Sequence, residues 1–204
     1  MPEFGHSVLE VLRQPMEDKH ITISSVRYSV DYPSNFTLVA SMNPCPCGYY
    51  NHPDKECTCS PAAGRRYAGR ISGPLMDRID LHVEITPVSR EELASAEPAE
   101  SSAADRERVM RARERQAERF RGTGIYTNTM MSSAMLRKFC PLSPDVRRLL
   151  DGAMERLQLS ARAYDRIIKV ARTIADLEGK ADIAPLHISE AITYRSLDRD
   201  SWGR

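Results

Sequence analysis

An asparagine that follows an apolar segment is the first residue of this chain whose position suggests chemistry. The segment 36–42 predicts a buried strand, and Asn43-Pro44 comes directly after it. Ligands of open α/β sheets bind at the carboxyl ends of the strands, where an amide can hold a water molecule or a phosphate oxygen without adding charge. The same dipeptide is also typical of a simple turn that ends a strand, so the pattern alone leaves both interpretations open.

Four of the five cysteines lie close together, in the pairs Cys45-x-Cys47 and Cys57-x-Cys59. Four thiolates from a proline-rich loop can bind Zn²⁺ tetrahedrally, and such a site would be structural because no coordination position stays open. The spacing differs from the usual Cys-x₂-Cys pattern, so four reduced thiols in a loop held by prolines are the alternative. In a reducing compartment the cluster argues against a disulfide framework, and the separate Cys140 is expected to be a buried apolar residue.

Composition excludes several classes of protein. The 204 residues contain 29 Lys and Arg against 28 Asp and Glu, a balance that argues against a strongly basic nucleic-acid-binding domain but not against a local basic patch. No apolar run approaches the roughly 20 residues of a membrane span. The N-terminus lacks the charged and then apolar pattern of a signal peptide. We therefore expect a cytoplasmic protein that does not act at a membrane.

Periodicity divides the chain into an α/β part over 1–88, a linker over 89–104 and a helical part over 105–204. Apolar and polar residues alternate over 21–32, which predicts a β-hairpin with its tip near Ser24-Ser25. The same alternation over 79–85 predicts a second strand of the sheet. Two prolines and a run of Ser and Ala mark the linker.

The second half of the chain has the spacing of amphipathic helices. Ser143-Pro144 and Ser160 are typical helix starts. The helix 160–178 is expected to be the most buried element, with one apolar face. The opposite, charged face is expected to comprise Arg162, Asp165, Arg166, Lys169, Arg172 and Asp176. The arginine-rich segment 105–121 is typical of a solvated helix face, with a basic strip for DNA phosphates as the alternative.

Several longer motifs occur in a fixed order and at close spacing. They are Pro2-Glu3-Phe4, the segment 9–18 (Leu-Glu-Val-Leu-Arg-Gln-Pro-Met-Glu-Asp), 42–48 (Met-Asn-Pro-Cys-Pro-Cys-Gly) and 70–80 (Arg-Ile-Ser-Gly-Pro-Leu-Met-Asp-Arg-Ile-Asp). Together they resemble the magnesium-chelatase-like AAA+ ATPases of the ComM/YifB type. The resemblance covers nearly the whole chain and is strongest over 2–85 and 160–179. It implies an α/β fragment, the second half of an AAA+ core with a β-hairpin insertion, followed by an all-α helical lid.

The resemblance implies catalytic roles for two residues of the α/β part. Asn43 matches the sensor 1 asparagine, which orients the attacking water or contacts the γ-phosphate. Arg78 matches the arginine finger, whose guanidinium reaches the nucleotide of a neighbouring subunit and stabilises the transferring phosphoryl group. Both are therefore expected at exposed strand ends. An ion cluster with Asp77 and Asp80 is the structural alternative for Arg78, and Arg70 is a weaker candidate for the finger.

The helical part and the hairpin contribute further candidates. Arg162, in the first turn of its helix, matches the sensor 2 arginine that reaches from the lid to the phosphates, and Arg166 one turn later competes for the role. An arginine at such a place is otherwise an ordinary solvated residue. The hairpin resembles the insertion that touches nucleic acid in ring helicases, which makes Arg27 near its tip a candidate for DNA contact. A hairpin that only packs on a neighbouring subunit is the alternative.

The chain departs from the family pattern at two motifs. It contains neither the phosphate-binding Gly-x-x-x-x-Gly-Lys-Ser/Thr nor the Walker B Asp-Glu pair. In the family these acids directly precede the segment that matches Pro2-Glu3-Phe4, so this chain is expected to be the C-terminal part of a longer protein. ATP and Mg²⁺ are the cofactors implied for the intact protein, and the isolated chain is expected to be inactive.

Two functions from different classes follow for the intact protein. The first is an ATP-driven ring, expected to be hexameric, that acts on DNA as a helicase or branch-migration motor. The second is a chelatase-type ATPase subunit that remodels a partner protein for metal insertion. A dedicated acidic extension that binds the partner would favour this second function, and the sequence shows none. A third interpretation concerns this chain alone, as an inert fragment without activity of its own.

Overall fold

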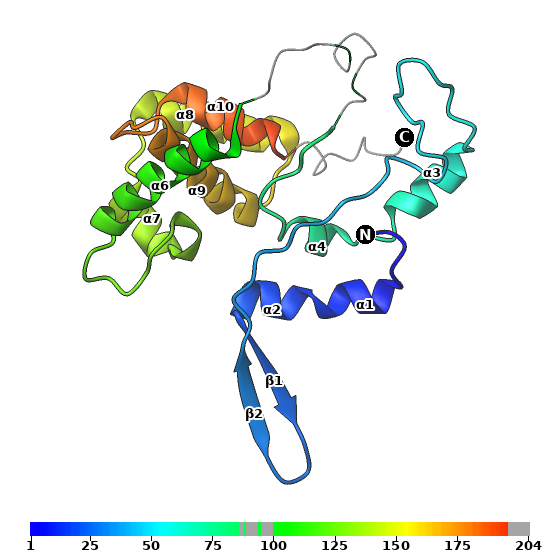
Figure 1. Cartoon of the computed structure of the whole chain (residues 1–204), viewed down its shortest axis with the longest axis horizontal. Helices are drawn as coiled ribbons and strands as arrows, with labels where there is room; N and C mark the ends of the chain where they lie inside the picture. The colour runs from blue at the N-terminus through cyan, green and yellow to red at the C-terminus, as the bar shows by residue number, and fades with distance from the viewer. Residues whose placement is uncertain (86–87, 89–93, 95–99, 196–204) are drawn as a thin grey trace. The chain divides into compact units, whose positions relative to one another are not determined.

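The computed structural model describes residues 1–85, 88, 94 and 100–195, which fall into two compact units (Figure 1). The first unit comprises Met1–Ile79, and the second begins at Asp80. Most of the expected linker 89–104 and the last residues of the expected helical part lie outside the described residues. Among the helices that the structure describes, none is long and apolar enough to cross a lipid bilayer.

The first unit has a small apolar core formed by short helices. Leu9, Ile71, Leu75 and Met76 are buried together. The last two helices each begin at a serine whose hydroxyl accepts a backbone N–H of the first turn, with a proline directly inside the helix. In chain order the elements are α1 (His6–Val11), α2 (Arg13–Asp18), β1 (His20–Ser24), β2 (Ser29–Pro33), α3 (Pro61–Ala68) and α4 (Gly73–Met76).

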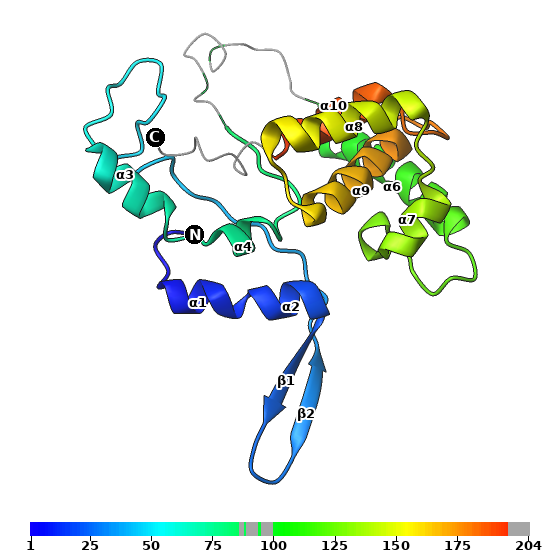
Figure 2. The same cartoon turned by 180° about the vertical axis from the view of Figure 1, so that it is seen from behind.

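The predicted β-hairpin is confirmed, and it projects from the end of α2 (Figure 2). Its two apolar cross-strand pairs share one face, and a hydrogen bond from Thr22 Oγ1 to Asp31 Oδ1, 2.6 Å long, lies on the other. The tip comprises residues 25–28, slightly later than predicted, because Ser24 still pairs with Ser29. The apolar pairs are Ile21 with Tyr32 and Ile23 with Val30.

The predicted strands 36–42 and 79–85 are not formed. The hairpin is the only sheet within the described ranges, and neither segment has regular secondary structure. A strand exists only where a neighbouring backbone accepts and donates its hydrogen bonds, and neither an apolar run nor alternation in the sequence supplies that neighbour. Apolar side chains of both segments are therefore exposed, with 89% of Val39 and 86% of Ile85 accessible to solvent.

The second unit is a helical bundle built around one helix, α9. This helix packs against α6, α7, α10 and the short 3₁₀ helix η1. As predicted, Ser143 and Ser160 cap their helices. Gly179, with a φ of +76°, follows the end of α9. The elements are α6 (Ser102–Arg119), η1 (Asn128–Met130), α7 (Ser133–Phe139), α8 (Pro144–Leu157), α9 (Ala161–Leu177) and α10 (Pro185–Thr193).

The charged face predicted for α9 is wrong at two positions. Arg172 is 2% exposed and Asp176 is fully buried, although both were expected on the solvated side. Buried charges are tolerated when opposite charges and polar groups surround them. Arg172 donates to the carbonyl oxygens of Lys180 and Ala181, at 2.6 and 2.5 Å, and it also forms an ion pair with Asp176.

The Asp176 carboxylate joins three elements of the second unit. Arg119 of α6 donates to it through both terminal nitrogens, and the Asn128 side chain of η1 donates to Oδ2 at 2.9 Å. Burial raises the pKa of Asp176, but these hydrogen bonds and the Arg172 charge outweigh it, so the net pKa lies below its ordinary value. The carboxylate is thus ionised inside the bundle and holds α6, η1 and α9 together.

The apolar face of α9 gives a first prediction. Ile168 is 4% exposed and packs in the main core, so Ile168→Ala should lower the free energy of unfolding by about 2–5 kcal/mol through the cavity it leaves. Urea titration followed by far-UV circular dichroism reports mainly on this helical unit. Leu177→Ala, at a half-exposed position of the same helix, is the matched control and should change stability by less than about 1 kcal/mol. Equal losses of unfolding free energy in the two variants would contradict the burial of Ile168 in the core.

The buried carboxylate gives a second prediction. Because its folded-state pKa is lowered, Asp176 stabilises the fold fully above the unfolded pKa of about 3.9 and loses that contribution as pH falls toward the folded value. Asp176→Asn should therefore lower the free energy of unfolding by about 3–5 kcal/mol at pH 7, and the deficit should shrink below about pH 4. Urea titrations between pH 3 and 7 measure it.

Asp145→Asn is the control for the second prediction. Asp145 is an exposed acid that pairs only with Arg148 one turn along its own helix among the contacts described for it. Its replacement should change stability by about 0.5 kcal/mol or less across the same pH range. A deficit for Asp176→Asn that does not depend on pH would contradict the argument.

Candidate metal centre and catalytic residues

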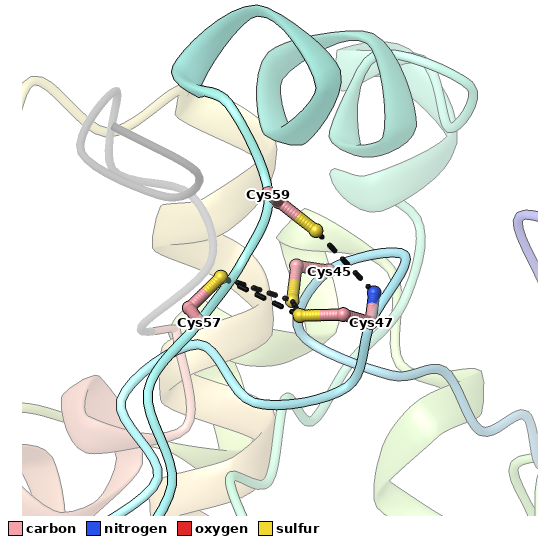
Figure 3. Close-up of side chains that lie close together, drawn as sticks. All are labelled: Cys45, Cys47, Cys57 and Cys59. Carbon is pink, nitrogen blue, oxygen red and sulfur yellow. Dashed lines mark hydrogen bonds between the residues drawn. The ribbon is translucent and has the colours of Figure 1, made fainter.

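The four clustered cysteines lie together at the two limbs of one loop (Figure 3). The Sγ atom of Cys45 is 3.3 Å from that of Cys47 and 3.7 Å from that of Cys57, and Cys47 and Cys57 are 3.6 Å apart. All four Sγ atoms lie within 4.8 Å of one another. The thiols are free, since a disulfide would bring two sulfurs to about 2.05 Å.

Local backbone structure directs these side chains toward each other. The Gly48 N–H donates to the Cys45 carbonyl at 3.0 Å, and Gly48 takes a φ of +83°, which glycine adopts without strain. This turn places the first cysteine pair on one limb. The second pair leads directly into Ser60, the N-cap of α3. Between the two limbs, the rings of Tyr49 and His52 make an edge-to-face contact within the loop.

Electrostatics within the cluster favour one thiolate over several. A hydrogen bond from the Tyr49 backbone lowers the pKa of Cys47 to about 5, with help from the neighbouring thiols. The Cys47 backbone N–H also lowers the pKa of Cys59, but the neighbouring thiols and burial outweigh it and raise that pKa to about 12. Full deprotonation of the cluster therefore needs a compensating cation.

Asn43 is exposed, as expected, on a backbone that is fixed on both sides. Its predecessor Met42 packs against the core of the first unit, and Cys45 two residues later is buried. The backbone of Asn43 also forms a hydrogen bond with the buried Tyr67 hydroxyl of α3. The side-chain amide of Asn43 thus lies on a loop whose backbone is anchored by these contacts, and not at the strand end that the sequence predicts. Tyr67 was not anticipated, and no local sequence signal marks it.

Arg78 is not at the surface position expected of it. Only 8% of the residue is exposed, and its guanidinium forms an ion pair with Glu17 of α2, with Nε 2.9 Å from Oε2. A second contact runs from Nη1 to the Pro74 carbonyl at 2.6 Å. The alternative, an ion cluster with Asp77 and Asp80, also differs from the structure, since Asp80 pairs with Arg166 of α9. Arg78 therefore has a structural partner in its own unit.

The remaining candidate arginines lie at positions of different exposure. Arg162 lies exposed in the first turn of α9, while Arg166 is engaged with Asp80. Arg27 is exposed in the hairpin tip, and Arg70 donates to the Pro2 carbonyl at 2.9 Å. Arg162 belongs to the second unit, whereas Asn43, Arg78 and the cysteines belong to the first.

Several arginines of α6 and the residues after it have the local ion pairs of a solvated helix face. Three arginines of the segment 105–121 pair with acids close by in the sequence, which is the behaviour of a solvated helix face. The pairs are Arg108 with Glu100 and Asp105, Arg111 with Glu107, and Arg121 with Glu118.

Comparison with known proteins places the chain in a family. The family described as magnesium chelatase, subunit ChlI, matches residues 1–93, and the family described as the C-terminal part of that subunit matches 99–195. Since the two matches together cover most of the chain, the chain belongs to the magnesium-chelatase-like proteins, and its relatives are of the YifB and ComM type.

Curated relatives align along almost the whole chain. It is 42% identical to the uncharacterized protein YifB of Escherichia coli over 201 residues and 40% identical to the competence protein ComM of Haemophilus influenzae over 200 residues. An uncharacterized protein of Mycobacterium tuberculosis is 40% identical over 194 residues. These alignments cover 98%, 98% and 95% of the chain, which spans 38% of the length of each relative.

Proposed function

We propose that the chain is the C-terminal part of the motor of an ATP-driven ring, expected to be hexameric and cytoplasmic, that acts on DNA. Residues 1–85 would supply the sensing edge of the nucleotide site, and the helical unit would be its lid. The consecutive matches to the ChlI subunit and to its C-terminal part support this division of the chain into two parts of one motor. Asn43 would orient the attacking water, and Arg162 would couple the phosphates to the lid.

The exposed Asn43 amide on an immobilised backbone is the observation that carries the proposal. A water molecule attacks efficiently only when its position is correct to well below about 1 Å, so a sensor residue must lie on a fixed backbone. The packing of Met42, the burial of Cys45 and the hydrogen bond to Tyr67 fix the backbone around Asn43. A turn residue without a function would need none of this support.

ATP and Mg²⁺ would be held mainly by a segment that this sequence does not contain. The chain has no Gly-x-x-x-x-Gly-Lys-Ser/Thr motif, so its own residues supply an amide and guanidinium groups but no phosphate-binding loop. Its contribution would be to orient and sense a nucleotide that the rest of the intact protein binds.

DNA is the proposed substrate because of the hairpin. Its tip presents Arg27 next to Tyr28, which is 64% exposed, and this pair offers a charge for a phosphate and a ring on which a base can stack. No contact in the described chain favours the alternative role as a chelatase subunit that remodels a partner protein.

A chimera tests the sensor. The chain would replace the matching 201-residue region of E. coli YifB, and we propose that the remainder of that relative would supply the phosphate-binding part. We expect magnesium-dependent ATP hydrolysis that Asn43→Ala lowers about 100-fold in kcat, since a misplaced nucleophile loses roughly that factor. Steady-state phosphate release measures it.

Two controls accompany this experiment. Asn35→Ala removes an exposed amide from the turn before the same segment and should leave kcat within about twofold. The chain alone should hydrolyse no ATP, because the sensors lack a phosphate-binding loop. Magnesium-dependent hydrolysis by the chain alone that Asn43→Ala removes, or an active chimera that Asn43→Ala leaves unchanged, would contradict the proposal.

The same chimera decides between the two roles of Arg78. If Arg78 acts as an arginine finger, Arg78→Ala should lower kcat about 10³-fold, whereas Glu17→Gln, which weakens the ion pair and keeps the guanidinium, should retain activity. If the residue only pairs with Glu17, both variants should lose thermal stability and kcat to a similar extent. Melting temperatures recorded beside the kinetics separate the outcomes.

A further inference from the structure

We infer that Cys45, Cys47, Cys57 and Cys59 bind one structural Zn²⁺ ion and that this ion fixes the backbone of Asn43. The first part stands on the geometry of the cysteines alone. The second part rests on the proposed function of Asn43 as a sensor.

The distances between the sulfurs match a single tetrahedral metal ion. A Zn–S bond of about 2.3 Å in a tetrahedron puts any two sulfurs about 3.8 Å apart. The sulfurs of Cys45, Cys47 and Cys57 lie 3.3, 3.6 and 3.7 Å apart, and Cys59 completes a cluster within 4.8 Å. Several iron atoms between the cysteines would hold the sulfurs further apart than a single ion does. The spacing therefore indicates a mononuclear site with four soft ligands, for which Zn²⁺ is the usual occupant.

Backbone N–H groups around the sulfurs suit thiolates. The Cys47 N–H donates to Cys59 Sγ at 3.4 Å, and the Tyr49 backbone donates to Cys47 Sγ. Hydrogen bonds of this kind hold metal-bound thiolates in place and stabilise their charge. His52, the histidine inside the loop, accepts the Asp54 N–H through Nδ1, and the cluster consists of the four cysteines. With four thiolates bound, no position is open for catalysis.

The metal site would connect two segments that both contact Asn43. Cys45 lies two residues after Asn43, and Cys59 directly precedes Ser60, which caps α3. Helix α3 carries Tyr67, whose hydroxyl bonds back to the Asn43 backbone. Residues 44–59 between these points contain no helix or strand, so a bound ion would be their main tie. Its loss would free one side of Asn43.

Metal analysis tests the first part. The chain is purified after growth with zinc, dialysed against metal-free buffer and analysed by inductively coupled plasma mass spectrometry. We expect about one zinc ion per chain, reduced about tenfold or more in Cys47→Ser and Cys57→Ser, because a serine hydroxyl is a poor ligand for zinc. Cys140→Ala removes the remaining, isolated cysteine and should retain the full zinc content.

A second measurement keeps the test valid if the serine variants fail to fold. The wild-type chain, freed of metal with a chelator, is titrated with Co²⁺, whose tetrahedral thiolate complexes absorb visible light. A spectrum of this kind that saturates at one equivalent, and that zinc abolishes, supports the site. A zinc-supplemented wild-type chain without zinc, iron in place of zinc, or an unchanged zinc content in Cys57→Ser overturns it.

Hydrogen exchange tests the second part. On removal of zinc, the backbone amides of 43–48 and 59–67 should exchange faster, while those of α8 and α9 should not change. Bound zinc without this change at Asn43 would overturn the positioning role. The metal site and the sensor can fail separately, since zinc content does not depend on ATP hydrolysis. A chimera with full zinc content and no effect of Asn43→Ala refutes the sensor alone.

Discussion

The buried carboxylate of Asp176 is the contact on which the helical unit depends. Its two oxygens accept hydrogen bonds from Arg119 of α6 and Asn128 of η1, and a second cation, Arg172, lies on the same helix. In a low-dielectric interior such a group is stabilising only when every charge has a partner, so the three elements must keep their relative positions. The apolar core supplies most of the burial, and this polar network adds a requirement for one arrangement of the helices.

The first unit is organised differently, by turns and helix caps rather than by a large core. Its core contains only a few apolar side chains, and its longest loop is directed by a glycine turn and a serine cap. Small cores commonly need a covalent or metal crosslink to be stable. The four converging thiols stand where such a link would be most effective, between the two limbs of the loop that carries Asn43.

Features that depend on nearby residues could be predicted from the sequence. The caps Ser143 and Ser160, the hairpin and the grouping of the cysteines all arise from contacts within about a dozen positions. Features that depend on distant partners could not. Asp176 can be buried as a charge because it pairs with Arg119, which lies 57 positions away in the sequence. Arg78 is likewise held by Glu17, at a separation of 61 positions. Likewise, the strand predicted over 36–42 depends on a backbone partner that spacing cannot reveal.

The exposed apolar segments around Val39 and Ile85 also bear on how the chain behaves in solution. Both residues are more than four-fifths accessible, one in an apolar run and the other in a segment of alternating apolar and polar residues. Exposed apolar side chains of this kind promote association between molecules. Hydrophobic attraction strengthens on warming from low temperature, so solutions of the isolated chain are best kept cold and dilute. The tendency of the isolated chain to associate in solution is therefore set by these two exposed apolar segments.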